Sequence, residues 1–328
     1  MKTRGRPTLT RSMLERLALA CAVVLAGCAD GPTGPERSLQ IVELGAGINP
    51  ALAGDRVVWQ RFNGGPILHL DLATERLDTL ARRTASFQVD HPTVHGNQVA
   101  WMETSDSGSS IALLRLGAEK RERVTDGSAR DRFPELSDEL LVWERRKAGG
   151  IADIFMRDPV TGRPIRIAPS PDRQTQPKVD GHRLVWTQSS IEDGSLSDHR
   201  VHLFDAETGQ TRTITEDERG GNPDVSGSVV VWVAAGGDIA YLDLDASGSL
   251  EPKTVAADAS FPAVSVPWIA WVDRGSGTNI RVHNIETGET FPITSDGLLR
   301  NFPEISRRRV IWNELQPDGW HVMMVTLE

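Results

Sequence analysis

The chain alternates apolar and polar positions over short segments, and one such segment recurs along nearly its whole length. It has the form Pro-x-apolar-x-x-x-x-apolar-x-Trp, with Pro and Trp always nine residues apart. The seven copies are NPALAGDRVVW, HPTVHGNQVAW, FPELSDELLVW, QPKVDGHRLVW, NPDVSGSVVVW, FPAVSVPWIAW and FPEISRRRVIW, with Trp at positions 59, 101, 143, 186, 232, 271 and 312. Because this spacing is constant while the Trp-to-Trp steps vary from 39 to 46 residues, we infer a repeated folding unit with loops of differing length.

Each copy has the pattern of two strands joined by a tight turn, such as Gly54-Asp55 or Gly96-Asn97. A third alternating strand follows the first six Trp strands. A second turn, written DPVTG, DAETG or NIETG in three copies, then leads to a fourth strand. No segment shows the longer 3.6-residue period of a helical repeat. The pattern therefore predicts an all-β fold, a seven-bladed β-propeller of four-stranded antiparallel blades.

The last repeat lacks a fourth strand of its own, and the N-terminal region supplies a candidate. Residues 320–325 have the pattern of a third strand after Trp312, and the chain then ends at Glu328. The segment SLQIVEL at 38–44 precedes the first repeat at the spacing of a fourth strand. We expect it to pair in the last blade and close the ring, because closure removes exposed strand edges.

Tryptophan is abundant, with nine residues beside a single Tyr, and seven of the nine belong to the repeat. Each of these seven is preceded by Val, Leu, Ile or Ala on the second strand of its copy. This position favours a core role, in which the indole ring fills the gap between neighbouring blades. The alternative is a ring of sugar-binding indoles. Trp268 and Trp320 lie outside the pattern, and we expect both to be partly exposed.

The N-terminus has the features of an export signal. Five basic residues precede an apolar run at 17–26, which is too short to span a bilayer. Leu25-Ala26-Gly27-Cys28 resembles a bacterial lipobox, so we predict a lipoprotein signal peptide at 1–27 and a lipid on Cys28. An ordinary signal peptide with a chance cysteine is the alternative. Residues 28–37 then form a flexible tether, and residues 38–328 the single propeller domain. These features favour anchoring in the bacterial envelope, at the outer membrane facing the periplasm.

Charge and cysteine content exclude several classes of function. Lys and Arg number 36 against 45 Asp and Glu, a formal net charge of −9, so we expect no nucleic-acid partner. Cleavage before Cys28 would remove five basic residues and one acidic residue and bring the charge to −13. It would also remove Cys21, which leaves no pair for a disulfide and no cysteine-based metal site. We expect a monomer.

The repeats resemble a known family. PDVSG at 223–227, PELSD at 134–138 and DAETGQTRTIT from Asp205 are similar to the repeats of the TolB-like β-propeller family, over about residues 38–328. The resemblance implies the architecture and leaves the function open, since propellers serve as scaffolds, enzymes and surface modules. TolB, after which the family is named, has six blades preceded by an α/β domain and is soluble in the periplasm. Here we count seven blades, a lipid anchor and no such domain, so a role in the Tol-Pal system is a family-level expectation only.

In a propeller the first strand of each blade lines the central channel, so the residues around each repeated Pro should converge on one mouth. The candidate ligand-binding residues are Asp90, His91, Arg132, Glu135, Gln176, Lys178, Asn222, Asp224, Asn301 and Glu304, together with Asn49, Phe133, Phe261 and Phe302. Such a mixture of acids, bases, amides and aromatics fits a peptide segment or a glycan. The alternative is a solvated channel without a specific ligand.

Signals for catalysis, cofactors and metals are mostly negative. His91, beside Asp90, is the one histidine that merits a test for acid-base or metal chemistry. His199 and His202 are three apart on a predicted strand, face opposite sides and cannot chelate one ion. The stretch 243–248 resembles a calcium loop but lacks its twelfth-position Glu and coincides with a repeated turn. The sequence holds no P-loop, nucleophile elbow or dinucleotide fingerprint. We expect no cofactor, no metal and no catalytic residue.

Two functional hypotheses follow. The preferred one is a lipid-anchored, non-enzymatic binding propeller that holds an envelope protein or glycan at its mouth. The alternative is a propeller-type polysaccharide lyase or hydrolase with its site in the channel. The second hypothesis requires two or more histidines and carboxylates to converge within metal-ligand distance there.

Overall fold

The computed structural model describes residues 39–328 except 63, 148–150, 193–194, 216–218, 248–250 and 276. The expected signal peptide at 1–27, the lipidation site Cys28 and the tether at 28–37 lie outside these residues. The described part forms strands and no helix, which confirms the all-β prediction. Among these residues no helix meets the length and apolarity needed to span a bilayer.

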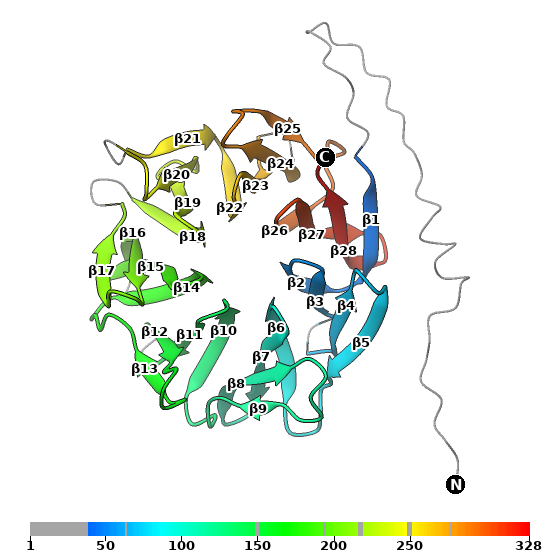
Figure 1. Ribbon diagram of the computed structural model, residues 1–328, viewed down its shortest axis with the longest axis vertical. Helices are drawn as coiled ribbons and strands as arrows, with labels where there is room; N and C mark the ends of the chain where they lie inside the picture. Colours follow the sequence, from blue (N-terminus) through cyan, green and yellow to red (C-terminus); the bar gives the residue numbers. More distant parts are fainter. Residues whose placement is uncertain are drawn as a thin grey trace, which may run out of the picture.

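The strands repeat in groups of four, and Figure 1 shows the groups arranged in a ring. The inner strands, nearest the centre, are β2 (Ile48–Ala53), β6 (Gln88–His95), β10 (Arg130–Leu136), β14 (Arg173–Asp180), β18 (Gly220–Ser226), β22 (Ala259–Ser265) and β26 (Arg300–Ser306). The second strands are β3 (Arg56–Gln60), β7 (Gln98–Ser105), β11 (Leu141–Arg146), β15 (Arg183–Glu192), β19 (Val229–Ala234), β23 (Trp268–Asp273) and β27 (Arg309–Gln316).

The third and outermost strands complete each group. The third strands are β4 (Ile67–Asp71), β8 (Gly108–Arg115), β12 (Ala152–Arg157), β16 (Ser195–Asp205), β20 (Ile239–Asp243), β24 (Asn279–Asn284) and β28 (Gly319–Thr326). The outermost strands are β5 (Arg76–Ala81), β9 (Glu122–Arg123), β13 (Pro164–Arg166), β17 (Gln210–Thr213), β21 (Lys253–Ala256), β25 (Thr290–Pro292) and β1 (Ile41–Ala46).

Hydrogen bonding joins these strands into several four-stranded antiparallel sheets and one sheet of eight strands. The larger sheet contains β6 to β9 and β10 to β13, and a single parallel bridge between Arg130 and Ser109 connects its two halves. In the sheet that contains the C-terminus, β1 pairs antiparallel with β28, with Ile41 opposite Val325. Figure 1 shows β1 beside β28 at the outer side of the ring.

The repeated tryptophans form the core, as the sequence predicts. All seven are between 0% and 1% exposed. Trp101 of β7, for example, packs with Val58 and Ile67 of the preceding sheet, so the indole fills the space between two sheets. Burial of each ring contributes about 2–3 kcal/mol. The expectation for Trp268 is wrong: it is 6% exposed, since its ring packs edge-on against Phe291 at 5.9 Å.

Turn chemistry explains the repeated DPVTG, DAETG and NIETG segments. Asp158, Asp205 and Asn284 each accept hydrogen bonds from the backbone N–H groups two and three residues ahead. Asp243, at the start of the calcium-like stretch, accepts from Asp245 N at 3.1 Å and from Ser228 Oγ at 2.6 Å. Its carboxylate therefore stabilises a turn as well.

Candidate functional site

Each inner strand carries a β-bulge at the repeated proline. The residue before that Pro has a positive φ, between 47° and 58°, in all seven strands, and the strand register shifts at the same point. We call these the rim residues: Asn49, His91, Phe133, Gln176, Asn222, Phe261 and Phe302. A positive φ is unusual for residues other than glycine. The bulge redirects the side chains around it, so simple alternation does not describe this part of the strand.

The rim residues contact one another from strand to strand. The rings of His91 and Phe133 lie 4.6 Å apart, as do those of Phe261 and Phe302. Gln176 Nε2 donates a hydrogen bond to Asn222 Oδ1. Equivalent positions of neighbouring inner strands therefore meet, which shows that these strands run in the same direction along the ring axis. We call the end of the ring at which they begin the rim face.

The residues directly after the repeated prolines meet at the centre of the ring. Lys178 Nζ lies 2.7 Å from Glu304 Oε1 and 3.1 Å from Glu135 Oε1. Glu135 Oε2 is also within 3.5 Å of Thr93 Oγ1, and Asp224 Oδ2 accepts a hydrogen bond from Val264 N at 2.8 Å. These four charged residues, Glu135, Lys178, Asp224 and Glu304, form what we call the central charge cluster.

The sequence predicts these four side chains as ligand contacts. In the structure Lys178 pairs with Glu135 and Glu304, and Asp224 acts on it electrostatically. β14 and β26 lie on opposite sides of the ring centre in Figure 1, so the Lys178–Glu304 ion pair crosses the axis. The exposed fractions of Lys178, Glu135 and Glu304 are 26%, 24% and 29%. One ammonium therefore faces two paired carboxylates, with the Asp224 carboxyl group acting on it electrostatically as a third acidic group.

Burial and mutual charge shift the protonation of this cluster. Burial raises the pKa of Asp224 to about 7, against the opposing attraction of Lys178. Burial likewise raises the pKa of Glu135. Burial alone would lower the pKa of Lys178, but the nearby Glu135, Glu304 and Asp224 outweigh it and hold that pKa well above its ordinary value. Lys178 is therefore cationic at neutral pH, and Asp224 titrates near it.

The remaining predicted residues are held by neighbours on the rim face. Asp90 accepts from Asn49 Nδ2 at 3.2 Å and from His91 N at 2.8 Å. His91 Nδ1 lies 3.0 Å from Asp90 Oδ1, yet no hydrogen bond forms at that nitrogen. Asn301 accepts from Asn313 Nδ2 at 2.9 Å. Arg132 pairs with Glu144 at 2.7 Å and stacks on Phe133 at 4.6 Å.

The sequence predicts Phe302 and Arg132 as single site residues and misses the two groups of side chains to which they belong. The first is a group of exposed apolar side chains beside Phe302, which is 47% exposed; the others are Leu298, Leu299 and Leu315. We call these four the apolar patch. Leu315 N donates to Leu299 O at 2.9 Å, which joins the two segments that carry them. The second feature is an excess of arginine around Glu144 on β10, β11 and β14. Both depend on which loops and strand ends lie side by side.

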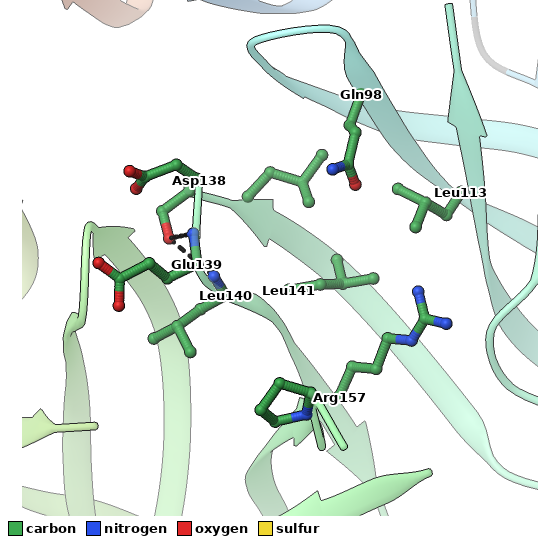
Figure 2. Close-up of a pocket in the computed structure, with 10 residues that line it drawn as sticks. Gln98, Leu113, Asp138, Glu139, Leu140, Leu141 and Arg157 are labelled. Atoms are coloured by element: carbon green, nitrogen blue, oxygen red, sulfur yellow. Dashed lines mark hydrogen bonds between the residues drawn. The ribbon is translucent and has the colours of Figure 1, made fainter. Parts of the chain in front are cut away.

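Two pockets lie at the other end of the ring, where the inner strands finish. One, of about 260 Å³, is lined by Gln98, Leu113, Leu141 and Arg157, with the turn at 137–140 beside them. Figure 2 shows Asp138 and Glu139 on this turn, whose backbone N–H groups at 139 and 140 bond to Ser137 Oγ. The other, of about 440 Å³, lies beside Val266, Trp268 and Arg308. Neither pocket is lined by a predicted site residue.

Within the described residues one group has donors suited to a metal ion. Atoms of His182, Asp205 and Glu207 all lie within 4.8 Å of one another. His182 is on the turn that joins β14 to β15, and the two acids lie where β16 turns towards β17. Asp205 already accepts the turn hydrogen bonds from residues 207 and 208, which lower its pKa. The group is thus accounted for by turn chemistry. His199 bonds to Ser189 Oγ at 2.6 Å, whereas His202 stacks on Trp186, so these two histidines have separate surroundings.

No protein-family model matches this sequence, and no curated protein matches it. Solved structures do. A puromycin-hydrolysing peptidase of Mycobacterium tuberculosis superimposes with a TM-score of 0.63 and 16% identity, over 88% of this chain and 51% of that one. The β-propeller domain of the Trilobed protease from Pyrococcus furiosus gives a TM-score of 0.61 and 11% identity, over 86% and 93%. The chain is a β-propeller.

At these identities the likeness concerns the fold alone, since one propeller architecture serves many functions. This propeller spans about half the length of the Mycobacterium tuberculosis peptidase. TolB from Acinetobacter baumannii is also similar, with a TM-score of 0.46 and 13% identity over 83% of this chain and 78% of that one. A TM-score below 0.5 supports no inference about this chain.

Proposed function

We propose that the ring is a closed propeller of seven four-stranded blades with TolB-like repeats. The eight-stranded sheet counts as two blades, because its halves share only the bridge between Arg130 and Ser109. The pairing of β1 with β28 supports closure, since it joins the first strand of the chain to the last. The seven rim bulges support the same count.

We propose further that this propeller is a non-enzymatic binding module whose rim face holds an envelope protein or a glycan. The observation that carries the proposal is the apolar patch next to the ring of rim residues. Phe302 and Leu299 are each 47% exposed although large apolar side chains favour burial. A patch of this kind bordered by amides and charged groups is typical of an interaction surface. Asn49, on the neighbouring strand β2, supplies such a polar group.

A polysaccharide lyase or hydrolase remains the alternative, and the geometry favours it less. Its site would need free ionisable groups at the centre, whereas Glu135 and Glu304 are both in ion pairs with Lys178 there. His91 is the only rim histidine, and in the described part of the chain no second histidine joins it at metal-ligand distance.

The proposal includes attachment to a membrane. A lipid on Cys28 would place β1, which begins at Ile41, a short tether away from the bilayer. The predicted signal at 1–27 would direct the protein to the bacterial envelope, at the periplasmic side of the outer membrane. The test compares the mature wild-type and Cys28→Ser proteins by mass, gel mobility and membrane fractionation. The variant should lack the acyl mass and leave the membrane fraction.

The binding role is tested by cross-linking in cells that make the full-length protein. Phe302→Ser should abolish capture of the partner, because it removes a large exposed apolar side chain from the patch. Val160→Ser is the matched control, since Val160 is 90% exposed on a turn at the other end of the ring. Equal capture by the two variants would contradict binding at the rim face. Cleavage of a polysaccharide by the purified wild type would favour the alternative.

A further inference from the structure

Four arginines gather on one side of β10, β11 and β14. Arg130 and Arg132 are two residues apart in β10, so their side chains share one face of the strand. Arg146 of β11 is the register partner of Arg130, and Glu144 is the partner of Arg132. Arg173 is the first residue of β14 and acts electrostatically on Glu144 as well as on Arg146.

The charges on this side do not balance. Glu144 is 1% exposed, and its Oε1 accepts hydrogen bonds from Arg132 Nε and Nη2 at 2.9 Å and 2.7 Å. Arg146 and Arg173 have no ion pair within the described ranges, and the Nε atom of each is buried without a hydrogen-bond partner. A buried donor without an acceptor costs free energy, and a guanidinium cannot lose its charge to avoid this.

The arginines also repel one another. The pKa of Arg146 is lowered, first by the charge of Arg132 and then by burial and by Arg173. On the other side of the same blade, Arg145 pairs with Asp131 at 2.6 Å, so the charges there are matched. The imbalance therefore belongs to one side of the blade only.

The fold does not require this arrangement. At the four positions equivalent to Arg130, Arg132, Glu144 and Arg146, every other repeat has at most one arginine. In the sixth repeat that arginine is Arg274, which lies 4.0 Å from Asp258 in an exposed pair. The other six blades form the same sheet without these extra arginines. Folding of the blade therefore does not explain why the third blade has them.

We propose that Arg132, Arg146 and Arg173 form a binding site for an oxyanion group, a carboxylate or a phosphate, on a ligand of the rim face. The inference rests on the proposed binding function and names the chemistry that one part of the partner must carry. Arginine presents a planar fork of donors that matches both oxyanions, and charge-assisted bonds of this kind are strong. In a chain with net charge −9, a local excess of positive charge would also attract an acidic ligand to this sector of the face.

The test is isothermal titration of the full-length protein with inorganic phosphate and, separately, with succinate. Wild type should bind at least one of them, and Arg146→Gln and Arg173→Gln should each weaken that binding by about tenfold, the loss of one charge-assisted contact. Arg274→Gln is the matched control, because Arg274 occupies the position of Arg146 in the sixth repeat, and it should bind as wild type does. The anion with the higher affinity shows whether phosphate or carboxylate is the preferred group.

Thermal unfolding distinguishes an anion-binding role of these arginines from a purely structural one. Without an anion, Arg146→Gln should melt no lower than wild type, because its loss relieves repulsion; phosphate or succinate should then raise the melting temperature of wild type more than that of the variant. The proposal is overturned when wild type binds neither anion, when Arg274→Gln loses affinity as Arg146→Gln does, or when Arg146→Gln melts well below wild type. Phe302→Ser should bind the anion normally, so failure of the partner-binding proposal is told apart from failure of this one.

Discussion

Lys178 Nζ on β14 lies 2.7 Å from Glu304 Oε1 on β26, although 126 residues separate them in the sequence. The two strands stand on opposite sides of the ring centre (Figure 1). A single side chain thus links distant parts of the ring, and Glu135 at 3.1 Å extends the link to β10. Ion pairs between Lys178, Glu135 and Glu304 therefore connect inner strands across the centre of this propeller.

Removing Lys178 should destabilise the fold. Lys178→Met leaves Glu135, Asp224 and Glu304 together without a counter-ion, and we expect the free energy of unfolding at pH 7 to fall by about 2–4 kcal/mol. Urea denaturation measures the change. Arg76→Met, which removes an exposed pair with Asp78, should cost less than about 1 kcal/mol. A Lys178→Met protein as stable as the control would show that the ion pair across the axis contributes little.

The raised pKa of Asp224 predicts a pH dependence of stability. A carboxyl group with a folded-state pKa near 7, against an ordinary 3.8, binds more protons in the folded state than in the unfolded state between these values. Its contribution is therefore complete below about pH 4 and is lost as pH rises to 7. Wild type should lose more stability from pH 4 to pH 8 than Asp224→Asn does, measured by urea unfolding at several pH values.

A surface carboxylate provides the control for that experiment. Hydrogen bonds from the turn at 158–162 lower the pKa of Asp158. Its contribution to stability therefore has the opposite pH dependence: it is present above about pH 4 and is lost as the pH falls below that value. Asp158→Asn should leave the slope above pH 5 as in wild type. An Asp224→Asn profile parallel to that of wild type would mean that Asp224 is ionised throughout.

Two buried tryptophans differ in one hydrogen bond, which makes them a matched pair. Trp143 Nε1 donates to Asp131 Oδ1 at 3.1 Å, whereas Trp232 Nε1 is buried without a partner. Both rings are fully buried, so Phe at either position creates a similar cavity. We expect Trp143→Phe to cost about 1–2 kcal/mol more than Trp232→Phe in chemical unfolding, because only the first leaves a buried carboxylate short of a donor. Equal losses would assign the cost to packing alone.

Strand β1 should be indispensable. Ile41 packs against the cluster of Trp312 and Val325, and Leu44 packs beside Trp59, so deleting residues 39–46 removes apolar contacts from two sheets and unpairs β28. The loss should be about 3 kcal/mol or more, enough to lower the melting temperature markedly. A protein that starts at residue 38 serves as control. A deletion variant that melts with this control would contradict the proposed closure of the ring.

The sequence predicts which residues of the inner strands lie near one end of the ring, but not which of them contact each other. The Pro-to-Trp spacing places His91, Phe133 and Gln176 at one position of successive inner strands, and the structure brings them to one end of the ring. The same reasoning could not tell that Glu135 and Lys178 bind each other. That contact depends on the width of the ring and on the bulge before each of them, which no local pattern specifies.

The strands, their turns and the burial of the repeated tryptophans can be predicted from residue order, because side-chain alternation and turn chemistry act over a few residues. Contacts between residues of different sheets cannot be predicted in this way. Lys178 is paired with Glu304, and Arg173 joins Arg146 beside one carboxylate. These relationships arise where sheets meet, at separations set by packing of the whole ring, and the chemistry of this protein is concentrated there.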